Sequence, residues 1–559
     1  MPGRWHIVAV VTSILFRNGI IHSPADPFAE ALLVDDGVVS WLGAEDTADG
    51  LAARADRVVD LAGALVAPGF VDSHVHVLET AFAAEGLDLS VSALPAGGRS
   101  LRAAALEAVA VRARATDPGD VVLAHGWDES TWEDARPLTA AELDSVTGGA
   151  AVYAARADVH CAVVSTRFAD LAGLRGLPGW HDDGFVTLDA NTAARHAART
   201  VTQERRDAMY VRTLQQAAAR GVVAVHENSA PGIDTRDGLA TLLSMTHDPR
   251  SGLPLVVGYR GELCRTVDDA RALLDAVPGL HGIGGDLCVD GSLGARTAAL
   301  RAPYSDDPTT AGTLHLDADA VRDHVLAVTA AGVQGGFHVI GDRALDVALE
   351  GIGAAASVSA QVRSAVRRLG HRLEHAEMVD AAAMDAFVRL GVRLSLQPAF
   401  DAAWGAPDGL YATRLGTARA AATNPFAALA SAGIPTAFGS DAPVTALDPW
   451  ATVRAAVFHH QPGQRISARA AFRASTRGGW RVAGLDHTGA GELRVGSPAH
   501  LAVWRAEHLG VQSEAPGLSS WSTDARSGTP LLPDLSDGSA TPRCLHTMRD
   551  GVPIFDLLD

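Results

Sequence analysis

The sequence contains no lysine, so all 46 of its basic residues are arginine. This absence excludes a Schiff-base lysine, the phosphate-binding lysine of a Walker motif and a carbamylated lysine that bridges two metal ions. Cysteine is also scarce, and its four residues are too widely spaced for a CxxC pair: Cys161, Cys264, Cys288 and Cys544. We therefore expect no disulfide scaffold, and a reducing cytoplasm is the predicted location.

Two further absences limit the partners of the chain. The net charge is −19, so the chain has no excess of positive charge. This argues against nucleic acid as a partner. No apolar stretch approaches the roughly 20 residues that span a bilayer, and the apolar run at residues 7–16 is interpreted as a buried strand and not as a targeting segment. We expect a small-molecule substrate and no membrane partner, with a homodimer as the assembly to consider.

The length and the order of predicted strands indicate several domains. A chain of 559 residues with 47% hydrophobic composition is too long for one core. Short strands are predicted at residues 7–16, 19–22, 31–34, 38–42 and 58–61, with a hairpin turn at Asp35-Asp36-Gly37, and again at 491–496, 501–504, 544–549 and 551–555. Neither set can bury both of its faces alone, so we predict one β-sandwich built from residues 1–66 and 486–559.

Residues 67–485 show a different pattern, in which apolar strands alternate with Ala-rich helices. The strands are predicted at residues 69–76, 222–226, 255–259, 287–289, 333–340, 372–375, 392–397 and 436–440, and helices at 317–331 and 380–390. Eight such units predict an α/β fold, a (β/α)8 TIM-type barrel. A doubly wound sheet is the alternative, although the glycines at 282, 284 and 285 form no GxGxxG fingerprint.

The first two barrel strands are unusually far apart in the sequence. About 145 residues separate His76 from Val222, far more than one helix and its loops require. This stretch has its own predicted strand at 121–124, a helix at 101–115 and a loop with Trp127 and Trp132. We therefore predict an inserted α/β subdomain at about residues 80–200, on the face of the barrel where loops carry function.

Residues that bind metals recur at the predicted ends of the barrel strands. They are His74 and His76, His226 and Glu227, Asp286 and Cys288, His338, His375, and Asp441. A lone histidine is more often a hydrogen-bonded structural residue than a ligand. Four histidines and an aspartate on separate strand ends favour a metal centre, because imidazoles and a carboxylate hold a divalent ion and leave one position open for water. A carboxylate at the rim can then move a proton to a leaving nitrogen.

Several sequence motifs resemble those of the amidohydrolase superfamily. They are Ala67-Pro68-Gly69-Phe70-Val71-Asp72-Ser73-His74-Val75-His76, Gly126-Trp127-Asp128, the run 290–298, His338-Val339-Ile340-Gly341-Asp342-Arg343-Ala344, Leu373-Glu374-His375 and Gly439-Ser440-Asp441. The chain is most similar to the "amidohydrolase 3" branch, which includes N-substituted formamide deformylase-like proteins. The resemblance implies a metal-bearing (β/α)8 barrel with a β-sandwich made from both termini.

The resemblance also implies roles for individual residues. His74 and His76 would bind the first metal ion, with Asp441 as a further ligand and proton shuttle. His338 and His375 would complete that site or hold a second ion, and either would assist catalysis. The insert and a family motif would supply the substrate-binding residues Trp127, Asp128, Asp158, His160 and Arg296, although the motif gives Arg296 no firm role.

The chain departs from many binuclear relatives at one position. They place a carbamylated lysine four residues before the Asp-Gly motif of the fourth strand, and this chain has Asp286 there. Because an aspartate is shorter than a carbamylated lysine, we expect one divalent ion, most readily zinc, in preference to two. Glu227 and Cys288 are further candidate ligands, and their ordinary roles would be a rim carboxylate and a core thiol.

The predicted activity is metal-dependent hydrolysis of a non-peptide C–N bond, an amide, in a small molecule. The loop with Trp127 and Trp132, together with Trp404 and Tyr411 after the seventh strand, indicates a pocket that accepts apolar or aromatic groups, although tryptophans on loops are as often packing residues. The nearest alternative is deamination of a cyclic amidine or an aromatic amine by a mononuclear centre. An alternative of another class is a non-catalytic barrel that acts as a binding protein.

Overall fold

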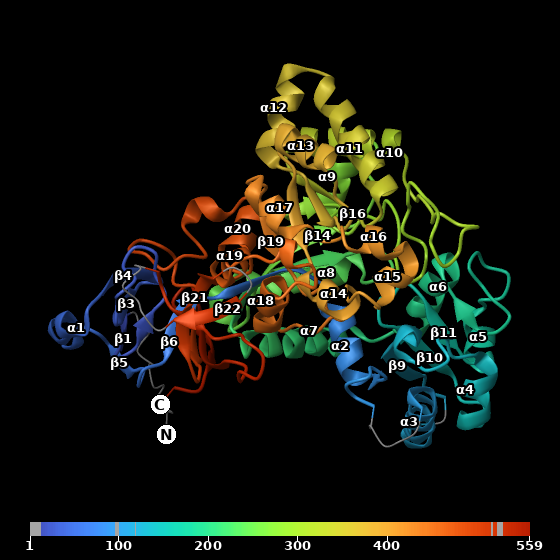
Figure 1. Ribbon diagram of the computed structural model, residues 1–559, viewed down its shortest axis with the longest axis horizontal. Helices are drawn as coiled ribbons and strands as arrows, with labels where there is room; N and C mark the ends of the chain where they lie inside the picture. Colours follow the sequence, from blue (N-terminus) through green and yellow to red (C-terminus); the bar gives the residue numbers. More distant parts are fainter. Residues whose placement is uncertain (1–12, 95–99, 118, 516–517, 523–528, 559) are drawn as a thin grey trace, which may run out of the picture.

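An eight-stranded parallel sheet forms the centre of the computed structural model, which describes residues 13–94, 100–117, 119–515, 518–522 and 529–558 (Figure 1). The order of the strands in the sheet follows their order in the chain: β7 (Phe70–Val75), β13 (Val222–Ser229), β14 (Leu255–Arg260), β15 (Gly282–Ile283), β16 (Gln334–Val339), β17 (Arg372–His375), β18 (Arg393–Leu396) and β19 (Thr436–Phe438).

The two outer strands of this sheet meet just beyond the end of β19. The amide of Asp441 donates to the carbonyl of His74 at 2.8 Å, and the amide of His76 donates to the carbonyl of Ala442 at 3.0 Å. The sheet is therefore a nearly closed barrel, as predicted. A doubly wound sheet is excluded, because its strand order would reverse in the middle.

The fourth barrel strand begins earlier in the chain than predicted, with β15, and the predicted residues 287–289 pair with β16 only through a single bridge from Cys288 to His338. The chain leaves β15 at Gly284 and Gly285, whose φ angles are 109° and 71°. A Cβ atom on Gly284 would lie 2.1 Å from the carbonyl oxygen of Gly336 on the neighbouring strand, so only glycine fits there. This bend places Asp286 at the C-terminal end of the strand.

Helices surround the barrel, and those predicted from the sequence begin where expected. The carboxylates of Asp317 and Asp380 accept bonds from the amides of Ala320 and Ala383, which caps α10 (Ala318–Ala331) and α13 (Ala381–Leu390). The other helices of this region are α2 (Val77–Glu85), α7 (Gln203–Ala218), α8 (Arg236–His247), α9 (Val267–Ala276), α11 (Asp342–Ser357), α12 (Ala360–Leu369), α14 (Pro398–Trp404), α15 (Leu410–Leu415), α16 (Thr417–Ala420), α17 (Phe426–Ser431), α18 (Pro449–Val457), α19 (Ala468–Ala474) and α20 (Arg477–Val482).

The long segment after β7 folds as a separate α/β unit, as predicted, at the lower right of Figure 1. Its five-stranded sheet has the order β12-β11-β10-β9-β8 and its own apolar cores. The strands are β8 (Leu87–Asp88), β9 (Val122–Trp127), β10 (Val152–Arg156), β11 (Ala162–Val164) and β12 (Phe185–Val186), and the helices are α3 (Leu101–Ala115), α4 (Ala140–Thr147), α5 (Thr166–Ala172) and α6 (Leu188–Ala198). Helix α7 then returns the chain to β13.

Both ends of the chain contribute to a pair of packed sheets on the opposite side of the barrel (Figure 1). The orders are β4-β3-β1-β5 and β2-β6-β20-β24-β25. Their strands are β1 (Ser13–Arg17), β2 (Ile20–Ile21), β3 (Ala31–Asp35), β4 (Val38–Gly43), β5 (Arg57–Asp60), β6 (Leu65–Pro68), β20 (Leu501–Arg505), β24 (Arg543–Arg549) and β25 (Val552–Asp556), with α1 (Glu45–Ala52) beside them. Antiparallel pairing of β6 with β20 joins the two ends, as the predicted β-sandwich requires.

Two details of the sandwich differ from the prediction. Residues 491–496 form turns and no strand, because Gly491 and Gly496 take φ angles of 84° and 85°. A small sheet of β21 (Leu509–Ala515), β22 (Leu518–Ser522) and β23 (Leu532–Pro533) was not predicted. Residues 7–12 of the first predicted strand lie outside the described residues. Within the described ranges, no helix has both the length and the apolarity to cross a membrane.

Candidate metal centre

His74 and His76 lie at the C-terminal end of β7 with their rings 5.1 Å apart. The Nδ1 atom of His74 is 2.8 Å from Oε2 of Glu374, and Nδ1 of His76 is 2.9 Å from the carbonyl oxygen of Asn228. Because each Nδ1 atom is held by an acceptor, the opposite nitrogen, Nε2, is the one presented to the centre.

Asp441 faces both of these Nε2 atoms from the other outer strand of the barrel. Its Oδ1 atom lies 3.3 Å from Nε2 of His74 and 3.1 Å from Nε2 of His76. Asp441 Oδ1 and His74 Nε2 are fully buried, and neither has a hydrogen-bond partner among the described residues. Buried polar atoms are normally paired, so two imidazoles and one carboxylate within 4.8 Å of one another fit a divalent cation.

Asp286 lies between this group and the two remaining histidines. Its Oδ1 atom is 3.0 Å from Nδ1 of His338 and 3.4 Å from Nε2 of His375, and its Oδ2 atom is 3.7 Å from Nε2 of His76. With His74 and His375 it forms a second group whose ligand atoms lie within 4.8 Å of one another. Asp286 therefore lies in the middle of the candidate ligands. Its position in the sequence only suggested that it could be one of them.

Two of the groups at the centre are held by bonds that the sequence did not predict. Nδ1 of His375 is 2.8 Å from Oε1 of Gln397, and Nε2 of His338 is 3.2 Å from the carbonyl oxygen of Gly291. Glu374 was visible in the Leu-Glu-His motif, and a carboxylate inside an apolar strand is a signal for such a role. Gln397 and the backbone carbonyl of Asn228 gave no comparable signal.

The carboxylates set the charge of the centre. Burial opposes the charged form of His76, but Asp441 and Asp286 outweigh it and raise its pKa to about 9. Burial also raises the pKa of Asp441, but His74 and His76 outweigh it, so that the pKa lies below its usual value. The same balance, with His338 as the main partner, lowers the pKa of Asp286 further. Both aspartates are therefore ionised and available to a cation.

The backbone at two of these residues is unusual. His375 has a φ angle of 68° and Asp441 one of 55°, which places both in the left-handed region. A residue other than glycine costs about 1–3 kcal/mol in such a conformation, and such strain is concentrated at functional sites. The positive φ of His375 also interrupts strand alternation, so His375 and its neighbour Glu374 both reach the centre.

A cavity of about 450 Å³ opens over the centre and lies between the barrel and the insert. Asp286, His338, His375 and Asp441 form its floor, and Arg195 of α6 belongs to its wall. A smaller inner recess is lined by the apolar rings of Phe400, Trp404 and Tyr411 and by the buried Glu377. Burial raises the pKa of Glu377 to about 7. The cavity is large enough for a small organic substrate.

Two of the five predicted substrate-binding residues line this cavity. Asp158 and His160 do so, and the ring of His160 lies 5.4 Å from that of His338. Trp127 is instead packed in the core of the insert, where its Nε1 donates to Ala154, because it lies inside β9 and not on a loop. Asp128 caps the turn after β9, and Arg296 pairs with Asp306 at 2.7 Å. Those three residues do not line the cavity.

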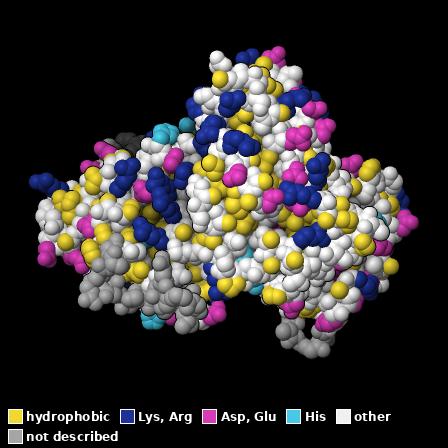
Figure 2. Space-filling model, turned by 45° about the horizontal axis from the view of Figure 1, so that its top comes forward, with side chains coloured by type: hydrophobic (Ala, Val, Ile, Leu, Met, Phe, Trp, Pro, Cys, Tyr) yellow, Lys and Arg dark blue, Asp and Glu magenta, His cyan; other side chains and the backbone are white. Residues whose placement is uncertain are grey.

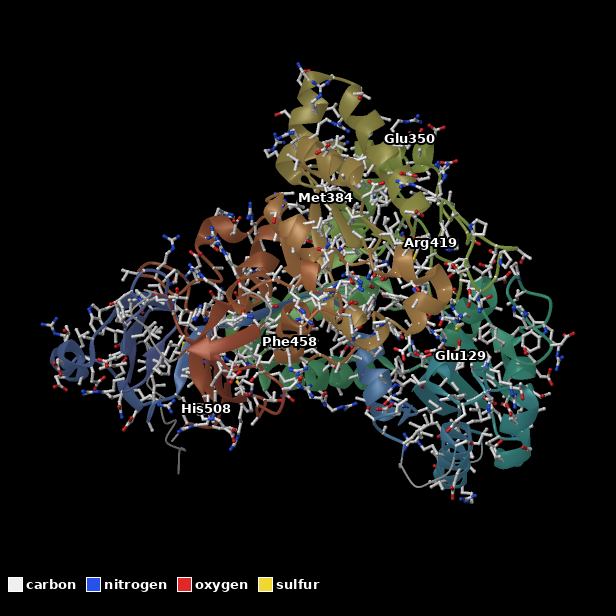
Figure 3. All side chains as sticks on the ribbon, in the orientation of Figure 1. Glu129, Glu350, Met384, Arg419, Phe458 and His508 are labelled. Carbon is white, nitrogen blue, oxygen red and sulfur yellow. The ribbon has the colours of Figure 1, made fainter. Side chains whose placement is uncertain are left out.

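Asp128 belongs to a buried network of charged side chains that contacts Asp158 of the cavity wall. Arg156 lies 3.0 Å from Asp128, 3.0 Å from Asp158 and 2.7 Å from Glu129. Glu129 also pairs with Arg414 of α15 at 3.3 Å, at the boundary between insert and barrel (Figure 3). The network fixes Asp158 at the cavity wall and ties the insert to the barrel.

The remaining candidate ligands lie beside the centre. Glu227 accepts a bond of 2.6 Å from the amide of Val77, and burial raises its pKa to about 7. Cys288 lines the cavity, and burial raises the pKa of its thiol far above the ordinary value. A protonated thiol is a poor metal ligand, so Cys288 fits the role of a packing residue. His226 is held in the barrel interior against Arg372 at 3.1 Å.

The fold and the site together define a barrel of the metal-dependent hydrolase type. The chain belongs to the amidohydrolase family, whose sequence profile matches residues 57–555. It is 26% identical over 526 residues to Protein LONG AFTER FAR-RED 3 of Arabidopsis thaliana, covering 88% of this chain and 87% of that protein. It is 24% identical over 520 residues to N-substituted formamide deformylase of Arthrobacter pascens, covering 85% of this chain and 90% of that protein.

The solved structures include a similar fold. The crystal structure of an uncharacterized metal-dependent hydrolase from Pyrococcus furiosus superposes with a TM-score of 0.66 at 27% identity. The match covers 88% of this chain and 98% of that one. The predicted family and barrel are thus confirmed.

Proposed function

We propose that the protein hydrolyses a non-peptide C–N bond, an amide, in a small organic molecule with the help of one divalent cation. The observation that carries the proposal is a pair of buried atoms without a hydrogen bond, His74 Nε2 and Asp441 Oδ1, which face each other at 3.3 Å, next to the cavity that Asp441 lines. The deformylase named above acts on N-substituted formamides, and this supports an amide as the substrate class.

A cation bound at this centre would supply Lewis acidity toward water and toward the amide carbonyl. His74, His76 and Asp441 would hold it, with their unengaged atoms already directed at one point. The Asp441 carboxylate is ionised, so it can take a proton from the attacking water and return it to the nitrogen that leaves. His375 borders the same floor, and its Nε2 can donate a hydrogen bond to the carbonyl oxygen as charge develops on it, whereas both ring nitrogens of His338 are engaged by Asp286 and Gly291.

The sharing of one ligand supports a single ion. His74 belongs to both candidate groups, and its single free nitrogen, Nε2, can bind only one ion. We therefore propose one ion, held mainly by His74, His76 and Asp441, with Asp286 as an additional carboxylate. A set of imidazoles and carboxylates suits zinc.

The test combines metal analysis with turnover of N-acyl and N-formyl amines. Protein purified without chelator should contain one equivalent of zinc, and His74→Ala should lose both metal and nearly all turnover. Asp441→Asn should lose turnover with less effect on substrate binding. Release of ammonia without a carboxylate product would favour the deaminase instead. Metal below a tenth of an equivalent, with no turnover after zinc or manganese addition, would refute an enzymatic role.

A further inference from the structure

A second cavity, of about 360 Å³, lies beside β18 and β19, between α17 and the helices α19 and α20. Its walls are largely apolar, with the side chains of Leu396, Phe426, Ile434, Phe438 and Ile466 around it. None of the residues of the metal centre lines it, so it is separate from the catalytic cavity. Its volume falls within the range of about 300–1,000 Å³ that is typical of small-molecule sites.

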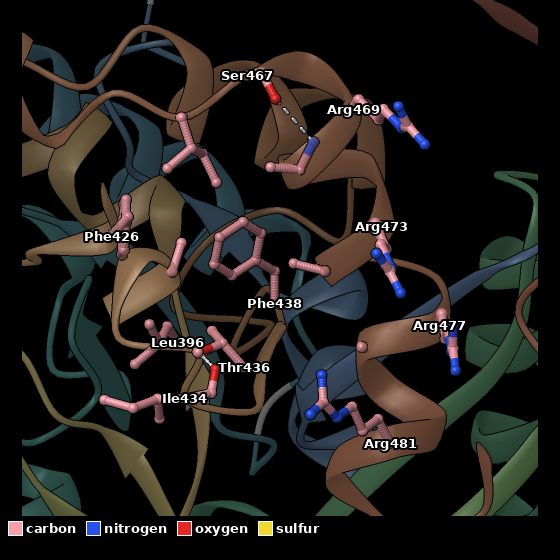
Figure 4. A pocket seen from close by; sticks show the side chains of 16 residues that line it. Leu396, Phe426, Ile434, Thr436, Phe438, Ser467, Arg469, Arg473, Arg477 and Arg481 are labelled. Carbon is pink, nitrogen blue, oxygen red and sulfur yellow. Dashed lines mark hydrogen bonds between the residues drawn. The ribbon is translucent and has the colours of Figure 1, made fainter. Parts of the chain in front are cut away.

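Four arginines form a row along the edge of this cavity (Figure 4). Arg469 and Arg473 are four residues apart on α19, and Arg477 and Arg481 are four apart on α20, so each pair lies on one face of its own helix. Arg477 pairs with Glu492 at 2.5 Å. Arg469, Arg473 and Arg481 have no ion-pair partner within the described part of the chain.

The charge of this region is opposite to that of the molecule. Residues 449–485 contain six arginines and no aspartate or glutamate, in a chain with 65 acidic residues and a net charge of −19. Figure 2 shows basic side chains gathered left of the centre, in the region where Figure 1 places α19 and α20.

Some surface arginines elsewhere in this chain are matched by carboxylates. Arg301, for example, pairs with Asp346 at 2.5 Å and with Asp380 at 2.7 Å. The row lacks such partners at three of its four arginines, among the described residues, and it lies beside an apolar cavity. Its positive charge remains available to a ligand.

We propose that this cavity binds a small anionic amphiphile, a molecule with a carboxylate or phosphate head and an apolar tail. Guanidinium groups bind carboxylate and phosphate oxygens in bidentate pairs, so the row supplies the site for the head. The apolar walls remove the tail from water, which favours binding in proportion to the area buried. The proposal does not depend on the function proposed for the metal centre.

The test measures direct binding to the full-length protein by isothermal titration calorimetry. The probes are decyl phosphate and decanoate below their micelle-forming concentrations, with decanol as the probe without charge and inorganic phosphate as the probe without tail. Both amphiphiles should bind with one site per chain, and both controls should bind at least about tenfold more weakly.

Two variants separate the contributions of head and tail. Arg469→Gln with Arg473→Gln should weaken the amphiphiles about tenfold, since charge-assisted hydrogen bonds are lost. Ala430→Phe, at an exposed position of the cavity wall, should block the tail and weaken them to a similar extent. Arg363→Gln, an exposed arginine of α12, is the matched control and should leave binding unchanged. Circular dichroism verifies that each variant is folded.

Three results would overturn the proposal. One is equal binding of decanol and decyl phosphate, and another is unchanged binding in the double arginine variant. The third distinguishes a dispersed ligand from a lipid surface. Binding to vesicles of phosphatidylcholine with phosphatidylglycerol, together with no binding of monomeric decyl phosphate, would show that the row contacts a membrane headgroup layer instead.

Discussion

Oε2 of Glu374 lies 2.8 Å from Nδ1 of His74, and neither side chain is exposed to solvent. The bond makes Nδ1 the protonated nitrogen and leaves Nε2 free to bind a metal ion. A neutral glutamine at this position would weaken both the orientation and the basicity of the ring. It would also leave Arg372, which pairs with Glu374, without its counter-charge.

Glu374→Gln should therefore lower the affinity for zinc by about 10-fold to 100-fold, the usual range for the loss of such a partner. Competition with a chromogenic chelator measures this affinity directly. Glu350→Gln, on the exposed side of α11, is the matched control and should leave the affinity unchanged (Figure 3). Unchanged affinity in the Glu374 variant would mean that Glu374 serves only Arg372.

Arg195 gives a prediction about substrate binding. Its Nη2 atom donates to the carbonyl of Val159, while its Nε atom is buried without a hydrogen-bond partner among the described residues. Its guanidinium belongs to the cavity wall, so we expect this group to donate to an oxygen of the substrate. Arg195→Gln should raise KM, and lower kcat/KM, by about 10-fold to 100-fold with little change in kcat. Arg167→Gln, exposed on α5, should change neither, and a loss confined to kcat would contradict the assignment.

Two buried histidines far from the solvent predict sensitivity to acid. Nδ1 of His324 accepts a bond from the amide of Cys264, and Nδ1 of His371 accepts one from the amide of Gly335, so both rings must be neutral in the folded protein. Burial lowers the pKa of His324 to about 4 and that of His371 to about 3.

The unfolded chain protonates these rings below pH 6.5, whereas the folded chain does not until about pH 4, so stability falls as the pH decreases across that interval. His324 alone should account for about 3 kcal/mol of this loss. Denaturant titrations at several pH values between 7 and 4 measure it. His324→Gln should flatten the dependence, and the exposed His247→Gln should not. Equal slopes in the two variants would contradict the prediction.

The contact between insert and barrel depends on Arg414. This buried guanidinium lies 2.6 Å from Asp306 and 3.3 Å from Glu129. Arg414→Met should leave Asp306 paired with Arg296 alone and Glu129 paired with Arg156 alone, and lower the free energy of unfolding by about 1.5–3 kcal/mol. Hydrogen exchange should show the loss in the insert first, and Arg389→Met on the exposed side of α13 should show none. Exchange that rises equally in every element would argue against a local contact.

The sequence predicted those parts of the fold that depend on local patterning. The helix at 101–115 coincides with α3, and the strand at 372–375 with β17, because apolar spacing and flanking turns define both. The first part of the fourth strand was missed because β15 has only two residues, and their pairing comes from neighbours distant in the sequence. Close approach of Gly284 to Gly336 is a tertiary requirement that no local pattern reveals.

The site, like the fold, was predicted only where it depends on local sequence patterns. His74, His76 and Asp441 were predicted to lie together because strand ends of a barrel meet at one face, and their ligand atoms do lie within 4.8 Å of one another. The central position of Asp286 was not predicted, because it depends on the bend after β15. Trp127 was expected at the cavity because it stands near a turn, yet β9 continues through it and buries its ring. Predictions from loops are weaker because a loop residue's direction is set by contacts elsewhere.

Asp286, which stands where many relatives have a carbamylated lysine, affects how the metal centre is assembled. A carbamylated lysine forms only when its amine captures carbon dioxide, so a centre built on it responds to the supply of bicarbonate. The carboxylate of Asp286 is present as soon as the chain is synthesised. Assembly of this centre therefore requires folding and a cation alone, and it should proceed equally well in carbonate-free buffer.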